Sequence, residues 1–386
     1  MEPYGFFPYP DWAAGRSGLR SSKGYVQMHE ARVLVVDDSA AMRALFSDLL
    51  DSARDVVVVG TAANADEARK QIAELRPNVL TLDVEMPGMS GIEFLEEIME
   101  GKPMPVVMLS SLTQSGTETS LKAYELGAVE CFPKPLKATP EQFAKTVGQL
   151  GKIVLAAANS NVKEAGVRRR AAAARPAATA GQIAAAPGFD WNGNVIALSA
   201  SMGGIDALGE LFARFPADCP PTAVVLGAEP MVVNAFIARM AGQLACGIVA
   251  AADGAALVPG TIHIAADPAH HLVVEAGSPP KLRLVARDPV EGARPSATLL
   301  YGTMARAGVT AAAAVLTGMG EDGARGLKML RDAGAATFAQ DPATAMVGEA
   351  PGAAIAAGGV QETLPLDALA CAILAKCSTT GIHRPG

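Results

Sequence analysis

The strongest constraint on the fold is an alternation of short apolar runs with segments of helical spacing. Strands that alternate with helices predict a parallel sheet covered by helices on both faces. Crossovers between parallel strands are right-handed, so the C-terminal ends of the strands meet at one edge, where ligand chemistry collects. In the first half of the chain, the expected strands are 33–36, 56–59, 79–82, 106–109 and 128–132, and the expected helices are 40–52, 65–75, 92–99 and 117–126.

The same alternation returns in the second half of the chain. Helical segments again lie between most of the apolar runs, which predicts a second parallel sheet. We therefore predict the α/β class, with two doubly wound parallel-sheet domains joined by a flexible linker. The expected strands of the second domain are 195–198, 223–226, 261–265, 312–316 and 336–339.

A low-complexity stretch separates the two alternating series. It is rich in Ala, Arg, Pro and Gly, as in RRRAAAARPAATAGQIAAAPG, and holds too few large apolar residues to bury a core. The predicted bounds are a disordered tail at 1–30, a first domain at 31–150, a linker at 151–193 and a second domain at 194–380. Two interpretations of the tail stay open: a short docking segment, or an extension ahead of a translation start at Met28.

Composition excludes several classes of protein. The formal net charge of -7 argues against nucleic-acid binding. The five cysteines form no C-x-x-C pair, which argues against a disulfide framework or a cysteine zinc site and favours a reducing compartment. No apolar run approaches the roughly 20 residues of a membrane-spanning helix, and no secretory signal is evident. We expect a cytoplasmic protein that neither inserts into membranes nor binds nucleic acid.

Charged and hydroxyl side chains follow four of the expected strands in the first domain. Asp37 and Asp38 end the first strand, Asp83 ends the third, Ser110 follows the fourth and Lys134 follows the fifth. Three carboxylates at one edge repel each other, and Mg2+ with oxygen ligands neutralises such a group. The metal and the lysine would then stabilise a phosphoryl group during its transfer to a carboxylate.

The segments VLVVDDS, LTLDVEMPGMSG, MLSS and FPKP resemble the receiver domain of bacterial response regulators. This resemblance implies that Asp83 accepts a phosphoryl group from a histidine kinase. It also implies that Ser110 is the switch hydroxyl and that Lys134 pairs with the phosphate. The implied Mg2+ ligands are Asp37, Asp38, Asp83 and the backbone carbonyl of Glu85.

One position departs from the receiver pattern. Receivers usually carry an aromatic residue three positions before the lysine, and this chain has Cys131 there, with Phe132 beside it. We expect phosphorylation to be intact, whereas the aromatic part of the switch is left without its usual residue.

The second domain has two glycine-rich turns, each between a strand and a helix. SASMGG places Ser201 at the start of a helix, where free N–H groups and the helix dipole stabilise an oxyanion. LTGMGEDG places Asp322 at the same edge. A serine at such a turn together with a distant aspartate indicates nucleophilic acyl transfer.

The segments SASMGG, VPG, RPS, LTGMGEDG, AQD and GGV resemble the effector domain of chemotaxis protein-glutamate methylesterases of the CheB type. Members of that family hydrolyse glutamate methyl esters on chemoreceptors, deamidate receptor glutamines and need no cofactor for this chemistry. The match implies that Ser201 is the nucleophile, that Asp322 orients the base and that the Met319 region lines the oxyanion site. The implied partners are the histidine kinase of a chemotaxis-type system and the methylated cytoplasmic domain of a chemoreceptor.

The family's catalytic base is missing from its expected position. That base is a histidine just after the second strand, usually within Gln-His-Met-Pro, and Gly227 stands there in this chain. His270 and His271 are candidate replacement bases, and Glu229 is a third. His263 lies within an expected strand and is most simply a core residue.

Two functions follow from this departure. The first is a phosphorylation-activated methylesterase whose receiver covers the active edge until Asp83 is phosphorylated. The second is a catalytically impaired, phosphorylation-regulated adaptor, because losing a triad member removes about 10^4-fold or more of the rate. A DNA-binding regulator is disfavoured, since no helix-turn-helix with a basic recognition face is evident.

Overall fold

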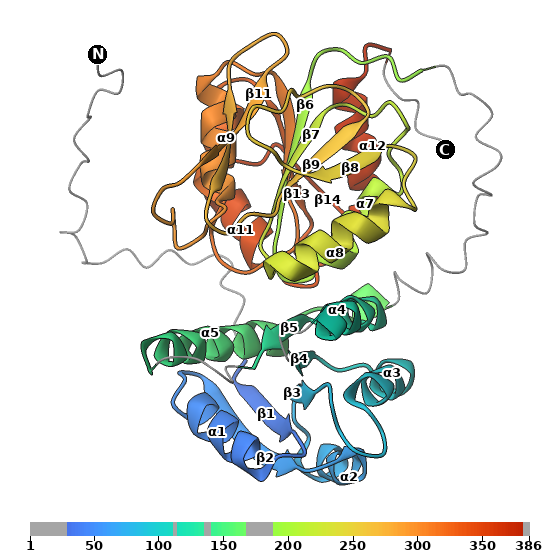
Figure 1. The fold of residues 1–386 in the computed structure, drawn as a ribbon, viewed down its shortest axis with the longest axis vertical. Helices are drawn as coiled ribbons and strands as arrows, with labels where there is room; N and C mark the ends of the chain where they lie inside the picture. The colour runs from blue at the N-terminus through green and yellow to red at the C-terminus, as the bar shows by residue number, and fades with distance from the viewer. Residues whose placement is uncertain (1–28, 111–113, 135–139, 167–187, 381–386) are drawn as a thin grey trace.

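The computed structural model describes residues 29–110, 114–134, 140–166 and 188–380. They form two α/β domains, the N-terminal one below the C-terminal one in Figure 1. The predicted tail up to residue 28 and the central part of the predicted linker, 167–187, lie outside the described residues. Within the described ranges, no helix is both long and apolar enough to span a membrane.

The N-terminal domain is a five-stranded parallel sheet in the order β2-β1-β3-β4-β5. All five predicted strands are confirmed, with small shifts at their ends. The strands are β1 (Ala31–Val36), β2 (Val56–Ala62), β3 (Val79–Asp83), β4 (Val106–Ser110) and β5 (Glu130–Pro133).

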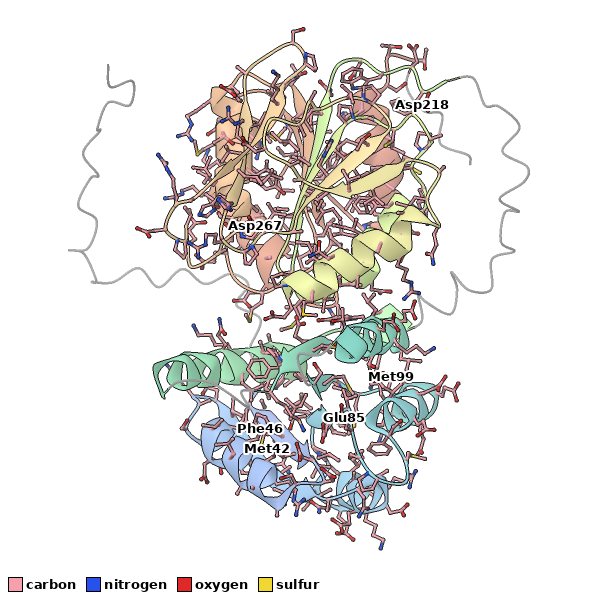
Figure 2. All side chains as sticks on the ribbon, viewed as in Figure 1. Met42, Phe46, Glu85, Met99, Asp218 and Asp267 are labelled. Atoms are coloured by element: carbon pink, nitrogen blue, oxygen red, sulfur yellow. The ribbon has the colours of Figure 1, made fainter. Side chains whose placement is uncertain are left out.

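Helices cover both faces of this sheet because successive strand residues point to opposite sides. Val33 and Val35 pack with α1 and α5, whereas Leu34 and Val36 pack with α2, α3 and α4. The α1 side chains Met42 and Phe46 lie together in Figure 2. The helices are α1 (Ala40–Asp51), α2 (Ala65–Leu75), α3 (Gly91–Gly101), α4 (Gln114–Leu126) and α5 (Pro140–Ala158).

The C-terminal domain contains a seven-stranded parallel sheet in the order β14-β13-β12-β6-β7-β9-β8. The five predicted strands are confirmed as β6 (Val195–Ala200), β7 (Thr222–Leu226), β9 (Thr261–Ala265), β12 (Ala311–Val315) and β13 (Ala336–Gln340). The sequence did not predict the short edge strands or the antiparallel hairpin. These additional strands are β8 (Gly247–Ala250), β14 (Glu362–Leu364), β10 (His271–Glu275) and β11 (Lys281–Val285).

Two groups of helices cover the second sheet. One group packs Leu300, Tyr301 and Leu327 against small strand residues such as Ala313. The alanines of β12 leave room for Tyr301, whose hydroxyl donates to the Ala314 carbonyl at 2.8 Å. That group is α9 (Ala297–Arg306), α10 (Ala324–Asp332) and α11 (Glu349–Ala356). The opposite face carries α7 (Gly204–Phe212), α8 (Pro230–Ala241) and α12 (Leu366–Cys377).

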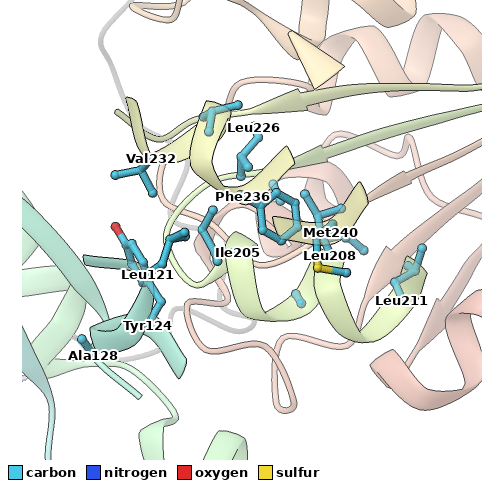
Figure 3. Packing of buried hydrophobic residues seen from close by; sticks show 14 of the residues in the cluster. Leu121, Tyr124, Ala128, Ile205, Leu208, Leu211, Leu226, Val232, Phe236 and Met240 are labelled. Atoms are coloured by element: carbon cyan, nitrogen blue, oxygen red, sulfur yellow. The ribbon is translucent and has the colours of Figure 1, made fainter. Parts of the chain in front are cut away.

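The two domains contact each other through α4 and through the segment after α5. Helix α4 lies against α8, and the Leu121 and Tyr124 side chains lie beside Ile205 in Figure 3. Helix α5 continues to Ala158, into the segment expected to be linker. Asn161, just beyond it, donates three hydrogen bonds to carbonyls of a C-terminal-domain loop: those of Met346 at 2.8 Å, Pro342 at 3.0 Å and Ala345 at 2.9 Å.

The close approach of α9 and α10 requires a glycine. A Cβ on Gly326 would lie 2.6 Å from the Thr298 carbonyl oxygen and 2.7 Å from its Cα. We expect Gly326→Ala to lower the free energy of unfolding by about 2 kcal/mol, because backbone atoms must move apart. Gly352→Ala in α11, where nothing lies within 4 Å, should instead raise it by about 0.5 kcal/mol. Urea denaturation measures both, and equal effects would contradict the packing argument.

Candidate functional site

The first polar cluster lies at the C-terminal edge of the N-terminal sheet. One carboxylate oxygen from each of Asp37, Asp38 and Asp83 can be chosen so that all lie within 4.8 Å of one another. The strand ends bring these side chains together, as the sequence predicted. Asp37 and Asp83 are buried, and the Ser39 N–H donates to Asp37 Oδ1 at 2.9 Å.

Lys134 lies against two of these carboxylates. Its Nζ is 2.9 Å from Asp37 Oδ2 and 2.7 Å from Asp83 Oδ1. Burial raises the pKa of Asp83, and the Lys134 ammonium opposes that shift. Burial also acts to lower the pKa of Lys134, but the two carboxylates outweigh it and leave that pKa raised. The Lys134 N–H donates to the Ser110 carbonyl at 2.8 Å, which joins the lysine to the predicted switch residue.

This cluster fits a small divalent cation. Its donors are hard carboxylate oxygens, which Mg2+ prefers, and two of them are withdrawn from water. Glu85 follows β3, and its N–H donates to Asp83 Oδ1 at 3.3 Å. A single lysine leaves the three negative charges incompletely neutralised, so a divalent ion would relieve their mutual repulsion.

The second polar cluster surrounds Ser201, directly after β6. The Ser201 hydroxyl oxygen accepts a hydrogen bond from the Met319 N–H at 3.0 Å. The Ser201 N–H donates to the Thr317 carbonyl at 3.0 Å. Gly203 has φ 76°, a left-handed conformation that turns the chain into α7 at Gly204. The serine therefore lies at the sheet edge before a helix N-terminus, as the sequence predicted.

A hydrogen-bonded loop supports the serine. Thr317 Oγ1 donates to the Met202 carbonyl at 2.9 Å and accepts from the Val347 N–H at 3.0 Å. The Gly318 N–H donates to the Val347 carbonyl at 2.9 Å. A Cβ on Gly318 would lie 2.3 Å from Ser201 Oγ, so only glycine leaves that hydroxyl its space. These bonds hold the Met319 N–H in line with Ser201.

Gly227 lies next to the serine. A Cβ built on it would lie 3.0 Å from the Cβ of Ser201, so a side chain at this position would begin in contact with the serine. Gly227 is exposed, and its N–H donates to the Ala200 carbonyl at 2.8 Å. Among the described residues, no carboxylate or imidazole is hydrogen-bonded to Ser201 Oγ.

Asp322 lies at the N-terminus of α9. Its Oδ1 accepts from the Ser296 hydroxyl at 2.6 Å and from the Thr298 N–H at 3.1 Å, and its Oδ2 accepts from the Ala297 N–H at 2.7 Å. These donors are the unpaired groups at the start of a helix, where negative charge is stabilising. The carboxylate therefore caps a helix, and no described histidine is bonded to it.

The two candidate histidines differ in their bonding. His271 is buried, with Nε2 3.0 Å from the Asp288 carbonyl and Nδ1 accepting from the Ser296 N–H at 3.2 Å. Both of its nitrogens are thus occupied. His270 is partly exposed, and its Nδ1 lies 2.6 Å from Asp267 Oδ2. His270 Nε2 has no hydrogen-bond partner in the described part of the chain.

The other two candidates are a histidine and a glutamate. His263 lies in β9 and is buried, and burial lowers its pKa, so the interpretation as a core residue is confirmed. Glu229 is the residue before α8 and makes no side-chain capping bond to that helix. The residue is exposed in the fold, and desolvation of its carboxyl raises the pKa. Neither side chain is hydrogen-bonded to Ser201.

Comparison with known proteins matches both halves of the chain. Residues 33–146 match the response regulator receiver domain, and residues 196–373 match the CheB methylesterase family. A Caulobacter vibrioides protein named protein-glutamate methylesterase/protein-glutamine glutaminase 1 is 42% identical over 348 residues, which cover 90% of this chain and 98% of that protein. The chain belongs to the CheB methylesterase family. An Agrobacterium fabrum member is 43% identical over 89% of this chain and 96% of its own length.

A solved structure of the Thermotoga maritima CheB methylesterase catalytic domain is also similar. It is 25% identical with a TM-score of 0.45 and covers 47% of this chain and 97% of that chain. The family matches over residues 33–146 and 196–373 identify the N-terminal domain as a response regulator receiver domain and the C-terminal domain as a CheB methylesterase domain.

Several residues around the methylesterase site were not predicted. Thr317 and Ser296 organise the serine loop and the α9 cap, and Asn161 joins the receiver side to the loop beside Met346. Ser296 lies in the RPS segment, which contributed to the family resemblance but did not predict the hydrogen bond to Asp322. Nothing in the local sequence signals the Asn161 contact, because it joins positions 181 to 185 residues apart.

The cap at α9 predicts a stability effect at Asp322. We expect Asp322→Ala to lower the free energy of unfolding by about 2 kcal/mol, since several helix donors lose their acceptor. Asp332→Ala removes an exposed carboxylate whose one ion pair among the described residues is with Lys328, and should cost less than about 0.5 kcal/mol. Thermal or urea unfolding measures the difference, and an unchanged stability of Asp322→Ala would contradict the capping role.

Proposed function

We propose that this chain is a phosphorylation-regulated protein-glutamate methylesterase that also deamidates glutamines. Its substrates would be methylated glutamates on the cytoplasmic domain of chemoreceptors. The observation that carries the proposal is the Ser201 hydroxyl beside the Met319 N–H at a strand–helix turn, in a chain 42% identical to a protein of that name. The adaptor alternative draws no support from these relatives.

The chemistry we propose is acyl transfer through Ser201. Its Oγ attacks the ester carbonyl carbon, and methanol leaves as the acyl-enzyme forms. Water then cleaves the acyl-enzyme and releases the glutamate carboxylate, so no cofactor is required. The Met319 N–H and the N-terminus of α7 would stabilise the oxyanion, because they are donors held in place before the reaction.

The receiver would control this site. We propose that a histidine kinase of a chemotaxis-type system phosphorylates Asp83 in the cytoplasm. Asp37, Asp38, Asp83 and the Glu85 carbonyl would hold Mg2+, which would neutralise charge during phosphoryl transfer. Lys134 would pair with the phosphoryl group, and Ser110 would hydrogen-bond it.

The interface supports inhibition in the unphosphorylated protein. Met202, next to Ser201, is buried in one cluster with Val154 and Val162 from the receiver side. Asn161 binds the adjacent loop at Met346. Both contacts lie beside the serine, where they would limit the approach of a receptor segment. Phosphorylation would weaken them by displacing Ser110 and the helix that follows it.

A methanol-release assay on methylated receptor tests the enzyme. We expect release that rises when the phosphodonor acetyl phosphate and Mg2+ are added. Ser201→Ala should reduce it to background, because the nucleophile is lost. Asp83→Asn should keep the basal rate, lose the stimulation and lose acetyl-phosphate labelling. Release that persists in Ser201→Ala would refute the nucleophile, and persistent labelling of Asp83→Asn would refute the phosphoacceptor.

The base requires its own test. We propose His270 as the replacement, because its Nδ1 pairs with Asp267 and its Nε2 is left to accept a proton. His270→Gln should lower kcat by about 10^2-fold or more without changing stability, as expected for a general base. His271→Gln should instead lower stability, because both nitrogens are bonded. Full activity in His270→Gln would exclude this histidine.

Gly227→His provides the complementary variant. A Cβ at position 227 would lie 3.0 Å from the Ser201 Cβ, so we expect an imidazole beside the serine to raise kcat above the parent rate. If Gly227→His raises kcat both in the parent protein and in the His270→Gln variant, position 227 is where the missing base would act. No rise in either background would mean that this position does not limit the reaction.

A further inference from the structure

The aromatic residue that the receiver lacks on β5 has a counterpart on α4. Cys131 occupies the β5 position, is buried, and its Sγ lies 3.7 Å from the Ser120 carbonyl of α4. The small thiol leaves room for a ring from the neighbouring helix. Tyr124, one turn beyond Ser120, is the residue that enters this space, and only 5% of it is exposed.

Tyr124 is tied to the β5 backbone. Its hydroxyl oxygen accepts from the Cys131 N–H at 3.1 Å, and the hydroxyl donates to Glu130 Oε1. Glu130 Oε1 also accepts from the Cys131 N–H at 3.0 Å. The tyrosine ring from α4 therefore lies over the position where a β5 aromatic would begin.

The same ring belongs to the interface with the methylesterase domain. Tyr124 and Leu121 share one buried cluster with Ile205 of α7 and Val232 of α8, and Figure 3 shows these side chains together. At the rim of this contact Glu125 of α4 forms an ion pair with Arg239 of α8. Tyr124 thus contacts the receiver strand on one side and the effector helices on the other.

The β5 end of this contact leads back to the phosphorylation site. Three residues after Cys131, Lys134 pairs with Asp83 and donates its N–H to the Ser110 carbonyl. Ser110 ends β4, shortly before α4 begins. A shift of Ser110 toward a phosphoryl group would therefore move α4 relative to β5, and the Tyr124 hydroxyl bonds span those two elements.

We propose that Tyr124 replaces the missing β5 aromatic as the positioning residue that transmits phosphorylation of Asp83 to the α4–α8 interface. This inference rests on the proposed phosphorylation control. Before phosphorylation, the hydroxyl bonds to β5 hold the ring against Ile205 and Val232, which keeps the domains closed. Movement of α4 breaks those bonds and withdraws the ring from the effector.

The Tyr124 hydroxyl also stabilises the charged form of the Glu130 carboxyl. Burial raises the pKa of Glu130 to about 7, with the Glu229 carboxylate adding to the shift and the Tyr124 and Cys131 bonds opposing it. Losing the tyrosine hydroxyl would leave the Glu130 carboxylate with one donor fewer beside Glu229. Because the tyrosine hydroxyl opposes the shift, its loss would raise the pKa of Glu130 further.

The test uses the full chain with beryllium fluoride and Mg2+ as a phosphoryl mimic. Hydrogen–deuterium exchange of α8 amides with and without the mimic gives a response that does not depend on esterase activity. In the parent protein, we expect the α8 amides to exchange at different rates with and without the mimic. In Tyr124→Leu they should exchange equally fast in both conditions, because the closed state of that variant is lost. Adding Cys131→Phe to Tyr124→Leu should restore the response, since the ring returns from β5. Lys122→Ala, exposed on the same helix, should respond like the parent.

Acetyl-phosphate labelling of Asp83 is measured in every variant to separate transmission from phosphorylation. If Tyr124→Leu is not labelled, Tyr124→Phe replaces it in the comparison. Losing only the hydroxyl should reduce the response about fivefold, the effect of one hydrogen bond. An unchanged response in a labelled Tyr124 variant would overturn the proposal, as would a loss that Cys131→Phe fails to restore. Failure of methanol release with a normal α8 response would count against the esterase alone.

Discussion

The structure depends on one constraint, the meeting of parallel strand ends at a single edge in each domain. Each strand delivers the residue that follows it to this edge, so Asp37 and Asp83 meet although they are 46 positions apart. The same geometry brings Ser201 of the β6 turn against Met319 of the β12 turn. The chemical groups therefore need no long loops to position them, and their precision comes from the sheets.

Buried hydrogen bonds then fix the details of the methylesterase edge. Thr317 joins the backbones of Met202 and Val347, and Gly318 leaves space for the serine hydroxyl. Asp322 is held by the start of α9. A carboxylate with that many donors is costly to redirect, because each donor would lose its partner. In this chain the aspartate therefore supports the scaffold, whatever further part it has in the chemistry.

The sequence predicted the parts of the molecule that depend on short-range patterns. Strand ends marked by Asp83 and Lys134 placed the receiver cluster correctly, and SASMGG placed Ser201 at a helix start. The edge strands were missed because β8 has four residues and β14 has three. The β10–β11 hairpin was missed because no helix separates its two strands, so it breaks the alternation of strands and helices. The contact of Tyr124 with Cys131 was missed for another reason. Residues on a helix and on the next strand reveal their proximity only once the helix has packed.

The Asn161 contact has a consequence for the architecture of the chain. Asn161 precedes the segment 167–187, so it remains covalently joined to the receiver, although it binds the methylesterase loop. While the chain is intact, this contact forms at the high effective concentration that a tether provides. A protease that cut within 167–187 would leave Asn161 on the receiver fragment. The same hydrogen bonds would then have to form between two separate molecules, and dilution alone would separate the fragments.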